Sequence, residues 1–250
     1  MKIPAQQLSL TLNTGDPIPQ LGLGVFKVDD EECERVVLEA LEVGYRHIDT
    51  AMIYRNEAAV GRAIARSGVA RDELFVTTKL WNSDQGKATT PDALATSLEL
   101  LGLDYVDLYL IHWPAPLRDV YVETWLAMED LYGQGLAKAI GVSNFEPDHL
   151  ERILEAGSIV PAINQVELHP AFQQRKVRGF QEPLGIVTEA WGPLGQGKYE
   201  LSELEGLEQI AQNHGKSIQQ IVLRWHLQEG VVVFPKTVQK KRMVENLSVF

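Results

Sequence analysis

The sequence predicts an α/β fold, a (β/α)8 barrel of the TIM type with an N-terminal β-hairpin closing one end. Eight short runs of apolar and β-branched residues alternate with longer segments of helical spacing, and such alternation produces parallel strands joined by helices. No linker, fixed-period repeat or low-complexity tract interrupts the 250 residues, a length common for one undivided barrel. We therefore treat residues 1–250 as a single domain, with a doubly wound sheet as the alternative arrangement.

The first segment differs in kind from the rest of the chain. Residues 8–19, LSLTLNTGDPIP, begin with an alternating strand pattern and continue with turn-forming residues. This pattern predicts a β-hairpin, which we expect to plug one end of the barrel.

The eight apolar runs follow in order. Each is nearly continuously apolar over its middle, as expected for a strand that is covered on both faces. The predicted strands are 20–26, 46–50, 74–80, 106–112, 137–143, 162–168, 185–191 and 231–236.

Helical spacing marks the segments between these strands. The first helix should begin after Asp29 and Asp30, which can cap an N-terminus, and end at Gly44. A later helix should open at Thr90-Pro91, with proline at its first position. Further helices are indicated by stripes containing Tyr121, Trp125, Met128, Leu131 and Tyr132, by Leu150, Ile153 and Leu154, and by the segment that starts at Ser217.

Several conspicuous residues have an ordinary structural interpretation. Pro183 should end early the helix predicted over 174–184, because proline lacks the required N–H. Trp125 and Trp225 lie on helical stripes and are expected in the core. The histidines expected to be structural are His47, His169 and His226.

Composition and charge exclude several classes of protein. The chain is 45% hydrophobic and carries 23 Lys and Arg against 34 Asp and Glu, a formal net charge of −11. It is therefore too apolar to be disordered and too acidic to attract nucleic acid or anionic lipid without a local basic patch. The first twenty residues lack the apolar core of a signal peptide. We expect a cytoplasmic monomer with no nucleic-acid or membrane partner.

The single cysteine gives no reason to expect redox chemistry. Cys33 lies in the acidic run DDEECER and has no second cysteine for an internal disulfide. Acidic neighbours raise a thiol pKa, so Cys33 is expected to be an unreactive helix residue.

Polar side chains close the predicted strands at the end where barrel enzymes place their chemistry. Asp49, Lys79 and His112 end three successive apolar runs. A constellation of this kind indicates a functional site. The other strands end in or near Ser143, Asn144, Gln165, Glu167, Trp191 and Lys236.

The types of residue at these strand ends predict proton transfer. Asp49 and Lys79 should form a buried ion pair, which could also be merely structural. Tyr54 follows five residues after Asp49, and an adjacent ammonium should lower its pKa and make it a usable general acid. His112 supplies a second donor for a developing alkoxide. No Gly-x-Ser-x-Gly, His-x-His or Gly-x-Gly-x-x-Gly motif supports a hydrolase, metal or Rossmann interpretation, and we expect no metal.

A basic segment follows the last predicted strand. Lys236, Lys240, Lys241 and Arg242 place four positive charges within seven residues of an acidic chain. Such a patch suits a dianionic phosphate, although alone it could equally be a solvated surface.

Taken together, these motifs resemble the aldo-keto reductase family over nearly the whole chain and in family order. Within the family the sequence is most similar to bacterial 2,5-diketo-gluconate reductases and related prokaryotic aldehyde and ketone reductases. The matching pieces are LGLGVFKV (21–28), GYRHIDTAMIYRNEAAVG (44–61), VTTKLW (76–81), VDLYLIHWP (106–114), IGVSNF (140–145), NQVELHP (164–170), AWGPLGQGK (190–198) and VFPKTVQKKRMVENL (233–247).

The resemblance implies an NADPH-dependent reductase of small carbonyl compounds. It implies that hydride passes from NADPH to an aldehyde, ketone or keto acid while Tyr54 donates the proton, assisted by Asp49, Lys79 and His112. The substrate pocket would be walled by Phe26, Trp81 and Trp113. The implied cofactor residues are Ser143, Asn144, Gln165 and Trp191 at the nicotinamide, Gly192, Leu194, Gly195, Gln196 and Gly197 across the pyrophosphate, Lys236, Thr237, Val238 and Arg242 at the 2′-phosphate, and Glu245 and Asn246 at the adenine.

Two departures from the family pattern and one neighbouring residue bear on specificity. Gln239 stands where close relatives often carry Arg, which leaves the degree of preference for NADPH over NADH open. The sequence stops at Phe250, before a segment that covers the substrate site in relatives, so the pocket is expected to lack one wall. Arg55 borders the expected pocket and could attract a carboxylate substrate, or could simply be solvated.

Two alternatives to a reductase come from other functional classes. One is a nucleotide-sensing protein of the same family with little turnover. The other is a hydrolytic barrel using carboxylates such as Asp49 and Glu167, in which Asn144, Gln165 and Trp191 would have no purpose.

Overall fold

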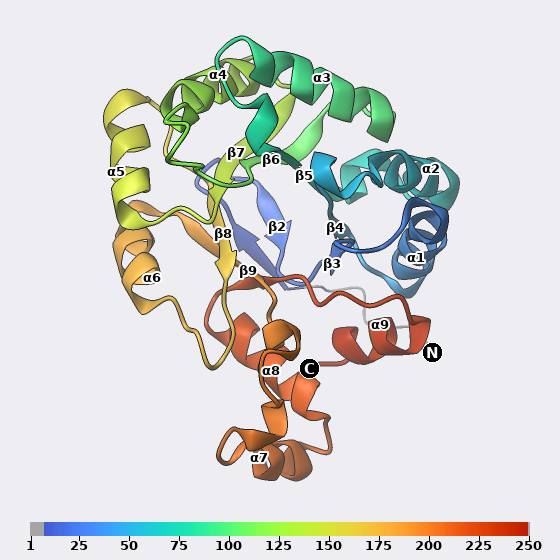
Figure 1. Cartoon of the computed structure of the whole chain (residues 1–250). Helices are drawn as coiled ribbons and strands as arrows, with labels where there is room; N and C mark the ends of the chain where they lie inside the picture. The colour runs from blue at the N-terminus through green and yellow to red at the C-terminus, as the bar shows by residue number, and fades with distance from the viewer. Residues whose placement is uncertain (1–7, 250) are drawn as a thin grey trace.

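Eight parallel strands form the centre of the computed structural model, which describes residues 8–249 (Figure 1). They lie side by side in chain order, and each of the eight predicted runs contains one of them. The strands are β3 (Leu23–Gly24), β4 (His47–Asp49), β5 (Phe75–Leu80), β6 (Val106–Ile111), β7 (Ala137–Ser143), β8 (Ile163–Glu167), β9 (Val187–Trp191) and β10 (Val232–Val233).

The sheet closes on itself next to β3. Leu21 forms a parallel bridge with Val233 of β10. The Gly22 N–H donates to the Val233 carbonyl at 2.9 Å, and the Val233 N–H donates to the Gln20 carbonyl at 2.8 Å. Glycine is required at position 22, because a Cβ there would lie 2.7 Å from the Phe234 ring. The fold is thus the predicted (β/α)8 barrel and not the doubly wound alternative.

Helices surround the barrel and cover the outer faces of its strands (Figure 1). The sequence pattern did not delimit α2, α7 or α9. The helices are α1 (Asp30–Val43), α2 (Glu57–Ser67), α3 (Thr89–Leu101), α4 (Tyr121–Gly133), α5 (Pro147–Ala156), α6 (Arg175–Gln181), α7 (Leu207–His214), α8 (Ile218–Gln228) and α9 (Lys240–Leu247).

Most of the predicted helix ends are confirmed. Gly44 ends α1 in the left-handed region at φ +112°, and Ser217 caps α8 by accepting a hydrogen bond from the Gln220 N–H. Pro183 ends α6 early, as predicted, and lies in the 3-10 turn Glu182–Leu184.

Two details of the predicted helix starts are wrong. Asp29 precedes α1 with extended backbone, but its side chain makes no capping hydrogen bond. Helix α3 starts at Thr89, so Pro91 is its third residue and not its first. Proline is tolerated there because the first-turn N–H groups have no partner within the helix.

The N-terminal hairpin plugs the barrel as predicted. Strands β1 (Ser9–Thr11) and β2 (Pro17–Pro19) pair antiparallel, with Leu10 opposite Ile18. Ile18 is fully buried in a small apolar cluster with side chains from inside the barrel. That cluster consists of Leu12, Ile18, Phe75, Leu108, Leu110, Ala139, Ala162, Ile163, Val232 and Phe234.

A larger apolar core fills the space between the barrel and its helices. Trp125 is fully buried in it, and Trp225 packs against it, as predicted. Cys33 is also buried there, and burial together with the Asp30 charge raises its thiol pKa to about 12. Among residues 8–249, no helix is long and apolar enough to cross a membrane.

Candidate active site

A buried ion pair lies where β4 and β5 end. Lys79 Nζ lies 2.6 Å from Asp49 Oδ1 and donates a second hydrogen bond to the Thr50 carbonyl at 2.9 Å. The Lys79 side chain is 0% exposed, so its charge depends on these partners. Burial alone would lower the pKa of Lys79, but the Asp49 carboxylate together with Tyr54 and Glu189 outweighs burial, and the pKa is raised. This is the ion pair that the sequence predicts.

Tyr54 is brought to this ion pair by a short turn after β4. It ends the 3-10 turn Met52–Tyr54, and Arg55 follows in the left-handed region at φ +58°. Lys79 Nζ lies 5.2 Å from the centre of the Tyr54 ring. Burial raises the pKa of Tyr54 above its usual value, and the Lys79 ammonium lowers it by less. The predicted influence of Lys79 is therefore present, but the expected net lowering of the Tyr54 pKa is wrong because burial has the larger effect.

His112 faces Tyr54 from the end of β6. Their rings lie 5.7 Å apart in an edge contact, and Trp81 makes a similar edge contact with His112 at 5.1 Å. Burial and the Lys79 charge lower the pKa of His112 to about 3. The imidazole is therefore neutral near pH 7, able to donate a hydrogen bond but not to act as the acid.

Aromatic side chains surround this pair of rings. The Phe26 ring lies 5.0 Å from the Tyr54 ring, while Trp81 contacts His112. Phe26 and Trp113 are 44% and 42% exposed, which is high for such large apolar groups. The three aromatic residues predicted for the substrate pocket thus lie next to the catalytic candidates or directly follow them in the chain.

Two further residues complete the barrel centre, one predicted and one missed. Gln165 Nε2 donates to Asp49 Oδ2 and to Glu189 Oε2, each at 2.9 Å. Glu189 was not among the predicted residues, although a charged residue inside the apolar run VTEAW was a detectable signal. Burial and the Asp49 charge raise the pKa of Glu189 to about 8.

The four predicted nicotinamide residues form one connected network beside the barrel centre. Trp191 Nε1 donates to Asn144 Oδ1 at 2.8 Å, and Asn144 Nδ2 donates to Ser143 Oγ at 3.0 Å. Ser143 Oγ donates in turn to the Gln165 carbonyl at 2.7 Å. Asn144 needs the left-handed region, at φ +63°, to bridge its neighbours.

The glycine-rich loop after β9 is held by contacts beyond it. Gly195 is left-handed at φ +80°, and a Cβ there would lie 2.5 Å from the Tyr199 ring, so only glycine fits. Tyr199 shares a hydrogen bond with His169 at 3.1 Å, and Lys198 pairs with Glu167 and lies over the Trp191 ring. The loop contains the predicted residues Gly192, Leu194, Gly195, Gln196 and Gly197.

The structural histidines have the expected environments. His47 contacts the Pro19 carbonyl at 3.2 Å and Thr77 Oγ1 at 3.1 Å, and His226 contacts the Pro193 carbonyl at 3.1 Å.

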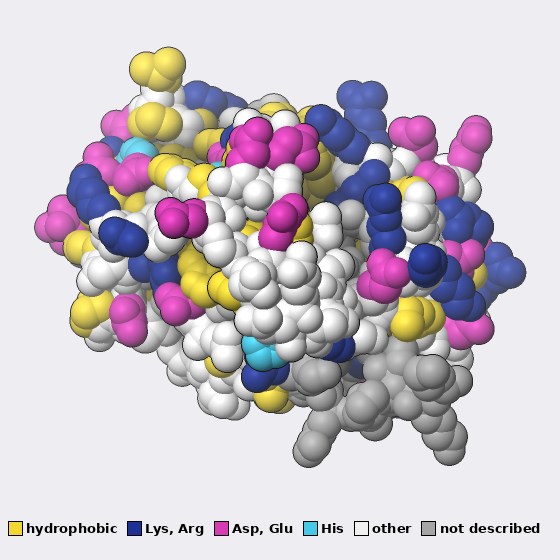
Figure 2. Space-filling view, turned by 90° about the horizontal axis from the view of Figure 1, so that it is seen from below, with side chains coloured by type: hydrophobic (Ala, Val, Ile, Leu, Met, Phe, Trp, Pro, Cys, Tyr) yellow, Lys and Arg dark blue, Asp and Glu magenta, His cyan; other side chains and the backbone are white. Residues whose placement is uncertain are grey.

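The four cations of the basic segment over 236–242 differ in whether they have a carboxylate partner. Lys240 forms an ion pair with Glu42 at 2.6 Å, and Lys241 lies 3.8 Å from Glu245. Neither Lys236 nor Arg242 has a carboxylate partner among residues 8–249. Figure 2 shows Lys and Arg side chains gathered on the side where Figure 1 places α9 and α1.

The other residues predicted in this segment differ in exposure. Thr237 and Asn246 are buried, whereas Glu245 is exposed. Thr237 Oγ1 accepts a hydrogen bond from the Gln239 N–H at 3.1 Å, at the start of α9. Val238 packs partly against the core.

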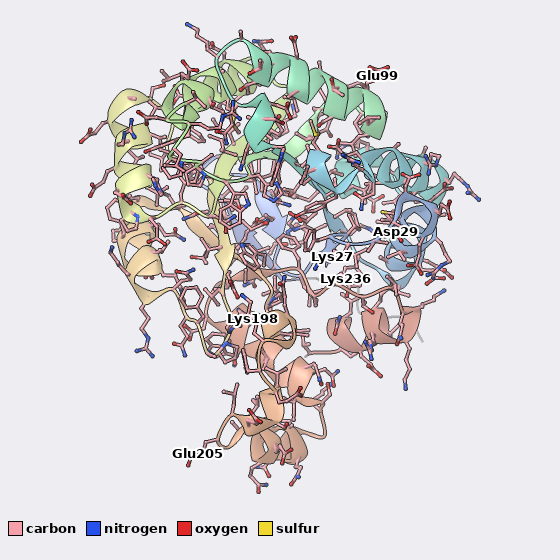
Figure 3. All side chains as sticks on the ribbon, viewed as in Figure 1. Lys27, Asp29, Glu99, Lys198, Glu205 and Lys236 are labelled. Carbon is pink, nitrogen blue, oxygen red and sulfur yellow. The ribbon has the colours of Figure 1, made fainter. Side chains whose placement is uncertain are left out.

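One further cation at the barrel mouth was missed by the sequence analysis. Lys27 follows β3 in the left-handed region at φ +56°, and in the view of Figure 3 it projects close to Lys236. The two loops leave neighbouring positions of the closed barrel, because Leu21 bridges Val233. Within the described part of the chain, no group of His, Cys, Asp and Glu side chains is arranged to hold a metal ion.

A closed (β/α)8 barrel with these residues at one end of its strands is the architecture of a barrel enzyme. Comparison with known sequences identifies the family. The model of the Aldo/keto reductase family matches residues 20–250, so the chain belongs to that family. The chain is 52% identical over 241 residues to an aldo-keto reductase of Mycolicibacterium smegmatis, covering 96% of this chain and 87% of that protein. It is 51% identical over 243 residues to the glyoxal reductase of Bacillus subtilis, covering 97% and 87%. It is 50% identical over 241 residues to the methylglyoxal reductase DkgA of Yersinia pestis, covering 96% and 86%.

Solved structures of the family have the same fold. An aldo/keto reductase from Brucella melitensis superposes with a TM-score of 0.94 at 51% identity, covering 98% of this chain and 92% of that one. A mutant of Gox0644 in complex with NADPH superposes with a TM-score of 0.93 at 47% identity, covering 98% and 88%. Family membership makes this chain an oxidoreductase, and the hydrolytic alternative is withdrawn.

Proposed function

We propose that this protein is an NADPH-dependent reductase that converts aldehydes, ketones or keto acids to alcohols. One observation carries the proposal: a tyrosine and a neutral histidine face each other above a buried Lys–Asp pair. Tyr54, His112, Lys79 and Asp49 make this arrangement, and aromatic side chains surround it. A carbonyl oxygen placed between the phenol and the imidazole would find two hydrogen-bond donors.

Tyr54 is proposed as the general acid. Its phenol is protonated at neutral pH because burial raises its pKa, so a proton is available for the carbonyl oxygen. As the proton leaves, the Lys79 ammonium stabilises the phenolate, and Asp49 keeps that ammonium in place. His112, with a pKa near 3, stays neutral and contributes a hydrogen bond that orients the substrate.

NADPH is proposed as the hydride donor, and several features of the site fit it. The side-chain oxygen of Gln165 accepts no hydrogen bond from a described residue, while its nitrogen is fully used. That oxygen can accept from the nicotinamide amide, with Ser143, Asn144 and Trp191 alongside. We assign the loop over 192–197 to the pyrophosphate.

The adenosine end of NADPH is assigned to the basic segment. Lys236 and Arg242 have positive charges without carboxylate partners within the described chain, which suits a 2′-phosphate. Thr237 and Val238 lie between them in sequence. We assign Glu245 and Asn246, one exposed and one buried, to the adenine.

Small carbonyl compounds are the proposed substrates. Relatives at about half identity are named glyoxal reductase and methylglyoxal reductase. The apolar rings of Phe26, Trp81 and Trp113 suit small, weakly polar molecules, and Arg55, which is exposed beside Tyr54, suits a keto-acid carboxylate.

The test is a steady-state assay of NADPH oxidation with methylglyoxal, simple aldehydes and a diketo acid, together with nucleotide titrations followed by tryptophan quenching. We expect turnover with at least one carbonyl class and tighter binding of NADPH than of NADH. Tight binding without turnover would favour the nucleotide-sensing alternative. Failure to bind either nucleotide would refute the proposal.

A further inference from the structure

Glu189 is a carboxyl group in the centre of the barrel for which the proposed reaction has no use. Its side chain is 0% exposed, and it lies on β9 directly opposite Gln165 of β8. Its Oε2 accepts a hydrogen bond from Gln165 Nε2, whereas its Oε1 is buried and has no partner in the described chain. Buried polar atoms are nearly always hydrogen-bonded, so a lone carboxyl oxygen here calls for an explanation.

The charges around Glu189 explain why it should be neutral. Asp49 and Lys79 balance each other, which leaves Glu189 as a second carboxyl without a cation of its own. Ionised, it would add a negative charge beside Asp49 in a dry interior. Burial and the Asp49 charge accordingly raise the pKa of Glu189 to about 8, against the smaller opposite effects of Gln165 and Lys79.

Glu189 and Asp49 together determine how the Gln165 side chain is oriented. A carboxamide nitrogen carries two hydrogens, and both are used here, one by each carboxyl group. Turning the amide over would place its oxygen against the Asp49 carboxylate, which cannot donate a hydrogen bond. The Gln165 oxygen therefore stays on the other side, where it accepts no hydrogen bond from a described residue.

We propose that Glu189 is a positioning residue: its neutral carboxyl fixes the Gln165 amide so that the amide oxygen is kept for the carboxamide of a bound nicotinamide, and its ionisation shifts the preference between NADP+ and NADPH. The inference rests on the proposed function, because it requires a nicotinamide at this end of the barrel. It adds a residue that neither hydride nor proton transfer uses directly.

The expected pH effect follows from the charges that face Glu189. The charged groups that act on Glu189 are Asp49 from β4 and Lys79 from β5. On the two neighbouring strands, the residues directly opposite Glu189 are the uncharged Gln165 of β8 and Val232 of β10. Lys79 keeps its charge because its pKa is raised. Ionised Glu189 would attract the positive ring of NADP+ but not the uncharged ring of NADPH. At this range one added charge should change relative affinity roughly three- to tenfold.

The experiment measures the dissociation constants of NADP+ and NADPH between pH 6.5 and 9. The 2′-phosphate titrates in both nucleotides and cancels from their ratio. In the wild type, NADP+ should gain on NADPH roughly three- to tenfold, with a midpoint near pH 8. Glu189→Gln keeps a neutral acceptor, so at pH 7 it should bind both nucleotides within about twofold of the wild type, and its ratio should not change with pH. Glu189→Leu should weaken both roughly tenfold.

A matched control and a spectroscopic signature separate positioning from mere structure. Glu57 is another buried glutamate, bonded to Thr78 outside the barrel centre, and Glu57→Gln should keep the pH dependence of the wild type. Infrared spectra of the cofactor-free protein should show the carbonyl stretch of a protonated carboxyl that disappears near pH 8 and is missing from Glu189→Gln.

Each outcome bears on one of the two proposals. A wild-type ratio that does not change with pH, a Glu189→Gln ratio that follows the wild type, or the absence of the infrared band would overturn the role of Glu189. Failure of the wild type to bind either nucleotide would overturn the proposed function, and the infrared band would still test the neutral carboxyl. Glu189→Gln is nearly isosteric, so the test does not depend on the folding of Glu189→Leu.

Discussion

The charged residues in the centre of the barrel and those on its rim differ in burial and in pairing. In the centre, Asp49, Lys79 and Glu189 are buried, and strand register sets their partners. On the rim, Lys236 and Arg242 are exposed and have no carboxylate partner within residues 8–249. The ion pair of the centre is complete in the folded chain, whereas the two rim cations remain available to a bound anion. The comparison teaches that changes at Asp49, Lys79 or Tyr54 should alter chemistry and stability, whereas changes on the rim should alter nucleotide affinity alone.

The largest effect is expected at the general acid. Tyr54→Phe removes the proposed proton donor while keeping the ring that packs against Phe26 and His112. We expect kcat for carbonyl reduction to fall about a thousandfold, with NADPH affinity within a few-fold of the wild type. Single-turnover kinetics and a nucleotide titration would measure both.

The opposite pattern would break the comparison. If Tyr54→Phe kept most of the rate, the acid would have to be another group. If it lost NADPH binding instead, Tyr54 would be part of the nucleotide site and its role would not be confined to proton transfer.

The next largest effect concerns stability. Lys79→Met removes the ammonium from a side chain that is 0% exposed and leaves Asp49 buried without its charged partner. Breaking a buried pair in this way costs about 3–5 kcal/mol, so urea unfolding should show a loss of about 3 kcal/mol. The double variant Lys79→Met with Asp49→Leu, which removes both charges, should recover part of that loss. If the single variant were as stable as the wild type, Asp49 would not depend on Lys79.

A smaller and purely binding effect is expected on the rim. Arg242→Ala should weaken NADPH binding roughly tenfold, because it removes a charged donor for the 2′-phosphate, and should leave NADH and kcat nearly unchanged. Lys241→Ala is the matched control, since Lys241 lies on the same helix, carries the same charge and is 3.8 Å from Glu245. Equal losses for NADPH and NADH, or for both variants, would refute the 2′-phosphate assignment.

The centre was also the more predictable of the two regions. Asp49, Lys79 and His112 each follow an apolar run, and the parallel barrel brings the ends of such runs together. Glu189 was missed for a physical reason. Its strand is buried on both faces, so the sequence does not show whether a side chain points into the barrel or toward a helix, and only the register with Gln165 decides.

Ion-pair partners and depth of burial depend on distances in the folded chain, which no sequence pattern contains. Lys240 pairs with Glu42, 198 positions away, whereas Lys236 has no carboxylate partner in the described part of the chain. Counting charges in the sequence did not separate these two lysines. The pKa of Tyr54 was predicted to fall and instead rises, because its direction depends on the depth of burial. The eight strands needed no such knowledge, since their hydrophobic pattern and spacing were sufficient.

The smallest expected effect is a pH dependence of stability that originates in the centre. Burial and Asp49 raise the pKa of Glu189 from 4.5 to about 8, so the folded protein holds a proton that the unfolded chain releases. Its contribution to stability is fully present below pH 4.5 and is lost as the pH rises through 8. Between pH 7 and 8 the free energy of unfolding of the wild type should therefore fall by about 1 kcal/mol relative to Glu189→Gln.

A buried histidine should cause the free energy of unfolding to fall on the acid side of the same pH profile. The pKa of His226 is lowered from 6.5 to about 4 by burial, so its contribution is lost as the pH falls below 6.5. His226→Gln should remove part of the acid slope and leave the alkaline fall unchanged, whereas Glu189→Gln should do the reverse. Urea unfolding at pH 5, 6.5, 7 and 8 would measure both limbs. An alkaline fall that persists in Glu189→Gln would mean that the buried proton belongs to another group, and the centre would not be the source of the pH response.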